Sequence, residues 1–174
     1  MANRLHGMRM STYKSAATAT EKTFVYDLWL TRAASAWIER GTMERVAVER
    51  NGLVRRFAPT WGHPGRPIVS GGDAVWTEFL EGEGRAVYVE DGSARLIEPL
   101  RGVNVGDLAL SGGTLLVECA DSLRFLTRTR DGWDQNQIVW QGNRSYRPCL
   151  AGNLAAWDTY IDGRYRIAVT RIGE

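Results

Sequence analysis

Short runs in which apolar and polar residues alternate recur along this chain of 174 residues, and glycine-rich or polar turns separate them. Alternation with a period of two residues is the pattern of a β-strand with one buried face. Four segments align almost without gaps, and each predicts two strands joined by a tight turn: DLWLTRAASAW (27–37), RPIVSGGDAVW (66–76), DLALSGGTLLV (107–117) and RPCLAGNLAAW (147–157). The chain therefore contains an internal repeat, whose segments end at the anchors Trp37, Trp76, Val117 and Trp157.

Two more strands are expected in most repeats. A third strand follows each anchor, with its core at Val46–Val48, Val87–Val89, Phe125–Thr127 or Ile167–Val169. A glycine-containing turn comes next, and Asn51-Gly52, Asp91-Gly92 and Asp131-Gly132 suit tight hairpins because glycine accepts positive φ without steric cost. Fourth strands are then expected at 53–57, 94–98 and 137–140.

Four antiparallel strands that recur every ~40 residues are typical of a β-propeller blade. We therefore predict an all-β fold, a β-propeller with four blades at about 27–58, 66–99, 107–141 and 147–172. A β-sandwich is the alternative, because short strands with similar spacing occur there too. A sandwich, however, gives no reason for a large apolar anchor at the same phase of four repeats.

The fourth repeat shows no outer strand of its own, and residues 18–26 are expected to supply it. Thr23, Phe24, Val25 and Tyr26 have the β-branched and aromatic character of a strand. Such a strand would close a four-bladed ring within one domain, 18–174, and would leave no unpaired blade edge. Two chains joined in one eight-bladed ring, or a larger assembly, are the alternatives. Residues 1–17 are basic and lack an apolar core, so they are expected to form a flexible arm.

Composition excludes some classes of function. The net charge of +2 gives no strong nucleic-acid signal, although 20 of the 22 basic residues are arginine. Cys119, Cys149, His6 and His63 form no cluster with metal-ligand spacing, so neither a metal nor another cofactor is expected. No stretch resembles a secretory signal or a membrane span, and we expect a cytoplasmic protein.

The first residues of the four segments carry charges that alternate in sign: Asp27, Arg66, Asp107 and Arg147. The first strand of a propeller blade is the innermost, so these side chains are expected to converge at the mouth of the central channel. One interpretation is a collar of salt bridges that fixes the blades, with arginine forks joining neighbours. The other is a polar site that binds a small anion, a carboxylate or a loop of a partner.

Tryptophans, arginines and acids elsewhere in the repeats are further candidates for packing, binding or catalysis. The tryptophan anchors are expected to pack between blades. Trp61 and Trp140, which precede the crossings between blades, are candidates for an exposed interface, together with Arg55 and Arg56 on an outer strand. The acids near the anchors do not share one strand face, and neither they nor the two histidines form a catalytic constellation, so we do not expect an enzyme.

The segment RPCLAGNLAAWDTYIDGRYRIAVTRI (147–172) resembles a blade of TolB-type and sialidase-type (BNR-like) propellers. In those repeats Arg-Pro opens the first strand, and a Trp-Asp pair precedes a turn that contains Asp-Gly. The resemblance implies the propeller fold. We expect a non-catalytic module for protein binding or assembly, a structural subunit with a protein partner or further copies of itself. A carbohydrate-binding or degenerate glycosidase-like propeller is the alternative, with a glycan or a small anion as ligand.

Overall fold

A computed structural model describes residues 24–31, 34–90, 92–120, 122–141 and 145–172. The described residues form antiparallel β-sheets and one short 3₁₀ helix, η1 (Glu98–Leu100), so the all-β prediction is confirmed. Among them, no helix is long and apolar enough to cross a membrane.

Each sheet corresponds to one repeat, and we number the sheets as blades. Blade 1 consists of β1 (Phe24–Leu30), β2 (Ala34–Arg40), β3 (Glu44–Arg50) and β4 (Leu53–Phe57). Blade 2 consists of β5 (His63–Pro64), β6 (Ile68–Ser70), β7 (Asp73–Leu80), β8 (Glu83–Glu90) and β9 (Ser93–Leu96). Blade 3 consists of β10 (Val105–Ser111), β11 (Thr114–Cys119), β12 (Ser122–Thr129) and β13 (Gly132–Gln141). Blade 4 consists of β14 (Ser145–Ala151), β15 (Leu154–Ile161) and β16 (Arg164–Arg171).

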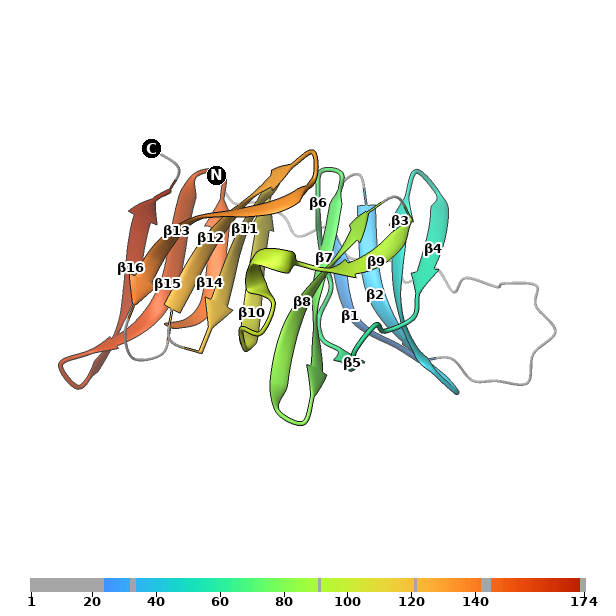
Figure 1. The fold of residues 1–174 in the computed structure, drawn as a ribbon, viewed down its shortest axis with the longest axis horizontal. Helices are drawn as coiled ribbons and strands as arrows, with labels where there is room; N and C mark the ends of the chain where they lie inside the picture. Colours follow the sequence, from blue (N-terminus) through green and yellow to red (C-terminus); the bar gives the residue numbers. More distant parts are fainter. Residues whose placement is uncertain (1–23, 32–33, 91, 121, 142–144, 173–174) are drawn as a thin grey trace, which may run out of the picture.

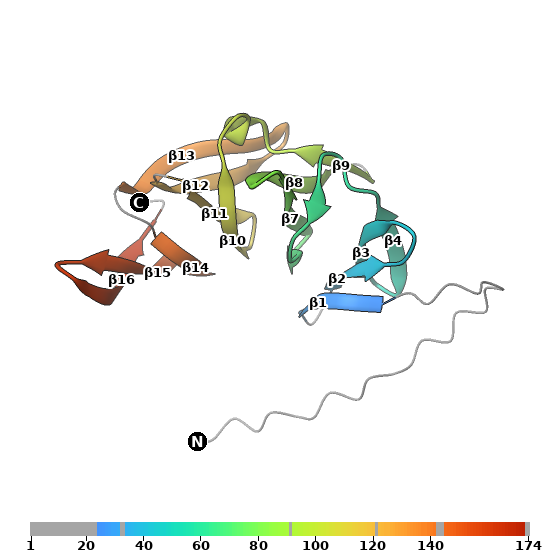
Figure 2. The same ribbon diagram turned by 90° about the horizontal axis from the view of Figure 1, so that it is seen from below.

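The four blades follow one another along an open arc (Figures 1 and 2). Their first strands lie side by side on the concave side, where β1 contacts β6, β6 contacts β10, and β10 contacts β14. Blade 1 and blade 4 lie at the two ends of this arc (Figure 2). The blades thus pack face to face, as in a propeller, but the described residues do not close the ring.

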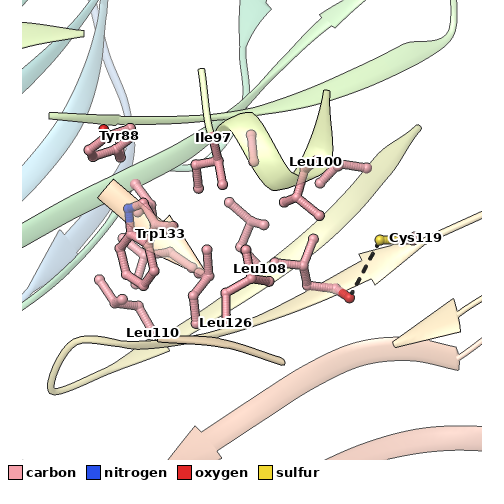
Figure 3. Close-up of a cluster of buried hydrophobic side chains, with 14 residues drawn as sticks. Tyr88, Ile97, Leu100, Leu108, Leu110, Cys119, Leu126 and Trp133 are labelled. Atoms are coloured by element: carbon pink, nitrogen blue, oxygen red, sulfur yellow. Dashed lines mark hydrogen bonds between the residues drawn. The ribbon is translucent and has the colours of Figure 1, made fainter. Parts of the chain in front are cut away.

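Three clusters of buried side chains hold the blades together, one at each junction. The cluster between blades 2 and 3 joins Tyr88 and Ile97 to Leu108, Leu126 and Trp133 (Figure 3). The other two clusters contain the anchors Trp76 and Trp157, which are buried against the preceding blade. Trp76, Val117 and Trp157 therefore pack between blades as the repeat predicted, whereas Trp37 in the first blade is half-buried and belongs to none of the three clusters.

Residues 24–26 do not supply an outer strand to blade 4. They begin β1 and pair with β2, with Phe24 opposite Arg40 and Tyr26 opposite Ile38. The physical reason is local: closing a short hairpin loop costs less entropy than bringing together two ends of the chain. The described part of blade 4 has three strands, with β16 at its edge. The remainder of the predicted strand and the predicted arm, residues 1–23, lie outside the described residues.

Candidate functional site

The innermost strand of every blade is interrupted at the same place by one extra residue. In β1 the register shifts between Tyr26 and Trp29, in β10 between Val105 and Leu108, and in β14 between Tyr146 and Cys149. In blade 2 the same break separates β5 from β6. Pro64 and Ile68 are four positions apart, whereas their partners on β7, Glu78 and Val75, are three positions apart, so the inner strand again has one extra residue. Such β-bulges bend a strand and redirect its side chains.

The four charged residues predicted at the channel mouth all lie at these bulges. Asp27, Arg66, Asp107 and Arg147 are exposed. Asp27 and Arg147 also adopt positive φ angles of 49° and 53°. This left-handed region is uncommon for residues other than glycine and is least favourable for long side chains such as arginine. In two of the four repeats a charged residue thus adopts a left-handed conformation, which glycine, asparagine and aspartate adopt more readily than arginine does.

A concave pocket of about 670 Å³ brings three of these charges together. Arg66, Asp107 and Arg147 line it, and Trp29 supplies part of its wall from blade 1. Asp27 is not part of the lining. Leucines of β10 and β14 form much of the apolar wall: Leu108, Leu110 and Leu150. All four blades therefore contribute to one hollow on the concave side of the arc.

The predicted salt-bridge collar does not form within the described part of the chain, since no ion pair there joins any two of these four residues. Arg66 instead lies over the ring of Trp29, with its guanidinium carbon 4.7 Å from the ring centroid. The indole nitrogen of Trp29 donates a hydrogen bond of 3.2 Å to the carbonyl of Val69 in blade 2. The cation–π contact and this hydrogen bond hold Arg66 and Trp29 together at the pocket wall.

A second set of contacts braces the bulge of blade 3 from two sides. The hydroxyl of Thr77 in blade 2 donates to the Gly106 carbonyl at 3.0 Å, and the backbone N–H of Asp107 donates to Glu118 Oε2 at 3.4 Å. A Cβ on Gly106 would come within 3.2 Å of the Glu118 carboxylate, so the close approach favours glycine. The backbone that carries Asp107 is thereby fixed relative to blade 2.

The residues predicted as an exposed interface are dispersed. Trp140 is half-buried and packs against Trp157, with ring centroids 6.3 Å apart, and Trp61 is half-buried beneath Arg85. Both tryptophans are thus half-buried, and Trp140 packs against the cluster between blades 3 and 4. Arg55 and Arg56 are exposed on the outer strand β4, and Arg56 forms a salt bridge of 2.8 Å with Glu39. None of the four lines the concave pocket.

Two residues that matter here were not among the predicted site residues. Trp29 has no counterpart at its position in the other segments, so its role beside Arg66 could not be read from the alignment. Glu78 is fully buried and accepts hydrogen bonds from Thr60, Trp61, Gly62 and the Trp76 indole. The spacing Trp-x-Glu, which Trp37 and Glu39 share, was the one available hint, and there too the indole donates to the carboxylate.

Comparison with known proteins supports the fold and no particular family. No protein-family model matches the sequence, and no curated protein matches it. Among solved structures, human WBSCR16 has a TM-score of 0.61 at 16% identity, covering 78% of this chain and 45% of that one. A prolyl endopeptidase structure has a TM-score of 0.62 at 16% identity, covering 83% of this chain and 25% of that one. Hsv2 of Kluyvelomyces marxianus has a TM-score of 0.53 at 11% identity, covering 87% of this chain and 49% of that one.

These similarities show a β-rich, propeller-like fold. At such low identity they carry no information on activity. The chain spans less than half the length of each of these three proteins. The finer resemblance to TolB-type and sialidase-type blades has no support from the comparisons.

Proposed function

We propose that this chain is a non-catalytic binding module whose concave pocket holds an acidic segment of a protein partner. The observation that carries the proposal is the set of exposed charges at the bulges: Arg66, Asp107 and Arg147 line one pocket of about 670 Å³. Two arginines and one aspartate give this lining a net positive charge. A carboxylate is the group that best matches a pair of guanidinium forks, because each fork can donate two parallel hydrogen bonds.

The pocket also offers what a peptide needs besides charge. Its apolar wall, formed by Leu108, Leu110 and Leu150, can cover aliphatic side chains of an extended segment. Asp107 adds an acceptor for a backbone N–H or a basic group. A small number of polar groups on an apolar wall is the usual composition of a binding pocket.

Pre-organisation supports the same interpretation. Arg66 is already held over Trp29, so less side-chain entropy is lost when it binds. The positive φ of Arg147 points the same way, because unfavourable backbone conformations of this kind cluster at functional sites. Arg66 also covers the ring of Trp29, which leaves that face less open for a sugar to stack on.

The test uses an array of peptides that place Asp or Glu among aliphatic residues, with matched peptides that carry Lys instead. We expect the protein to select the acidic peptides. We expect Arg66→Gln to weaken binding of a selected peptide about tenfold or more, as measured by fluorescence anisotropy, because a charge-assisted hydrogen bond is worth about 1.5–3 kcal/mol.

Arg130→Gln is the matched control. Arg130 is an exposed arginine in the turn between β12 and β13, outside the pocket, so this variant makes the same change of charge. Its affinity should stay within about threefold of wild type. Equal losses of peptide affinity in the two variants would mean that only the overall charge matters. The proposal would be refuted if the protein did not prefer the acidic peptides to the lysine peptides.

A further inference from the structure

Blade 4 exposes the positions that every other blade buries against its successor. In blades 1 to 3 two residues of the third strand face the next blade and are buried: Val46 and Val48, Ala86 and Tyr88, Leu123 and Phe125. The strand registers make Ile167 and Val169 their equivalents in blade 4. These two side chains are 74% and 64% exposed.

Exposed tyrosines extend this apolar surface along the same sheet. Tyr165 lies on the same face as Ile167, since residues two apart in a strand share a face. Its ring packs edge-to-face on Tyr160, with centroids 5.0 Å apart. We call the surface formed by Tyr160, Tyr165, Ile167 and Val169 the trailing face of blade 4.

The opposite end of the arc shows the complementary feature. The repeat alignment makes Leu30 equivalent to Val69 and Leu110, both of which are buried at blade junctions, yet Leu30 is 51% exposed. Leu28, the equivalent of the buried Leu108, is exposed as well. Trp37 is half-buried, whereas the anchors Trp76, Val117 and Trp157 are buried. Leu28, Leu30 and Trp37 define the leading face of blade 1.

The side chains of Glu39 and Ser35 on this leading face already have partners within blade 1. Glu39 accepts hydrogen bonds from Arg56 at 2.8 Å and from the Trp37 indole at 3.3 Å. The hydroxyl of Ser35 donates to Glu49 at 2.8 Å. Covering the face would therefore not leave these groups without a hydrogen-bond partner, and an orphaned polar group is what makes burial costly.

We infer that a second copy of this chain covers both faces, so that two four-bladed arcs form one eight-bladed ring. The junctions within the chain show what fits each face: a trailing face packs against a leading face. Within the part of the chain that the structure describes, each copy has one uncovered face of each kind. A two-fold axis would form two equivalent junctions, trailing to leading, and would close the assembly.

Closure by a second arc would also enclose the concave pocket in a central channel, together with the pocket of the other copy.

The test is the mass of the protein in solution, measured by light scattering after size exclusion across micromolar concentrations. We expect twice the chain mass of 19.4 kDa, and an eight-bladed ring in electron micrographs. Ile167→Glu places a charge in both junctions at once, and we expect at least about a hundredfold weaker dimer, so that the variant elutes as a monomer.

Ile138→Glu is the matched control. Ile138 is 46% exposed on β13, the outer strand of blade 3, away from both faces. This variant should remain dimeric, and the circular dichroism of both variants should match wild type.

Three results would overturn the inference. One is a wild-type monomer at all concentrations, which stands as evidence even if Ile167→Glu does not fold. Another is a mass that keeps increasing with protein concentration, since head-to-tail contacts that do not close a ring produce filaments. The third is a ring of a single polypeptide in which further blades cover the two faces.

Discussion

The carboxylate of Glu78 offers a direct test of how the connection between blades 1 and 2 is held. Glu78 lies on β7 and is fully buried. Its Oε2 accepts from the backbone N–H groups of Thr60 at 2.9 Å, Trp61 at 2.6 Å and Gly62 at 3.3 Å, and from the Thr60 hydroxyl at 3.0 Å. Its Oε1 accepts from the Trp76 indole at 3.0 Å. Glu78 therefore ties the loop before β5 to the core.

Glu78→Gln removes this capacity with little change in volume. The amide can direct its single oxygen either to the loop or to the Trp76 indole, and its NH₂ group then meets donors on the other side. When the amide oxygen faces the loop, the buried Trp76 indole loses its acceptor; when the oxygen faces the indole, the backbone N–H groups of the loop lose theirs. Each such orphan costs about 1–3 kcal/mol, so we expect a loss of about 3 kcal/mol in the free energy of unfolding. This is a large part of the ~5–15 kcal/mol that stabilises a typical domain.

The assay is urea unfolding followed by circular dichroism, with the free energy extrapolated to water. The midpoint should fall while the denaturant dependence stays unchanged, because the surface exposed on unfolding is similar. Glu83→Gln is the control, since Glu83 is an exposed carboxylate on the neighbouring strand β8, and its effect should stay within about 0.5 kcal/mol. A loss below about 1 kcal/mol for Glu78→Gln would refute the reasoning.

Two further stability predictions concern the packing at Gly84 and the acid response of Glu44. A Cβ at Gly84 would lie 1.8 Å from the Val105 carbonyl oxygen, so Gly84→Ala should destabilise the protein by at least about 2 kcal/mol in thermal unfolding. Gly72→Ala is the control and should not destabilise the protein, because a Cβ at Gly72 would have no atom within 4 Å. Burial alone would raise the pKa of Glu44, but hydrogen bonds with His63 and Arg40 outweigh it and lower the pKa below its usual 4.5. A carboxylate whose pKa is lowered in the folded state stabilises the protein above its unfolded pKa, and this contribution is lost as the pH falls through the folded pKa. Urea unfolding between about pH 6 and pH 3 should thus show a steeper loss for wild type than for Glu44→Gln, by less than about 1 kcal/mol, and equal slopes would contradict the assignment.

The candidate site was partly predictable because it follows the repeat. Asp27, Arg66, Asp107 and Arg147 share one phase, and equivalent phases of packed blades lie side by side. Whether their charges pair was not predictable, since it depends on where each bulge directs its side chain. Arg66 lies over Trp29, a residue from another repeat 37 positions earlier, and no periodicity links the two.

By itself the sequence determined the number of blades, their strands and the phase of the anchors, because alternation and turn residues act over a few neighbouring positions. The tertiary structure decided that the blades form an open arc, that residues 24–26 begin the innermost strand of blade 1, and that Trp140 is packed against Trp157. The pairing of residues 24–26 with β2 follows from the low entropy cost of closing a short hairpin. The open arc and the packing of Trp140 depend instead on how side chains of different blades fit together across junctions. Such fit involves volumes and directions of residues that are distant in the chain, which a local pattern does not encode.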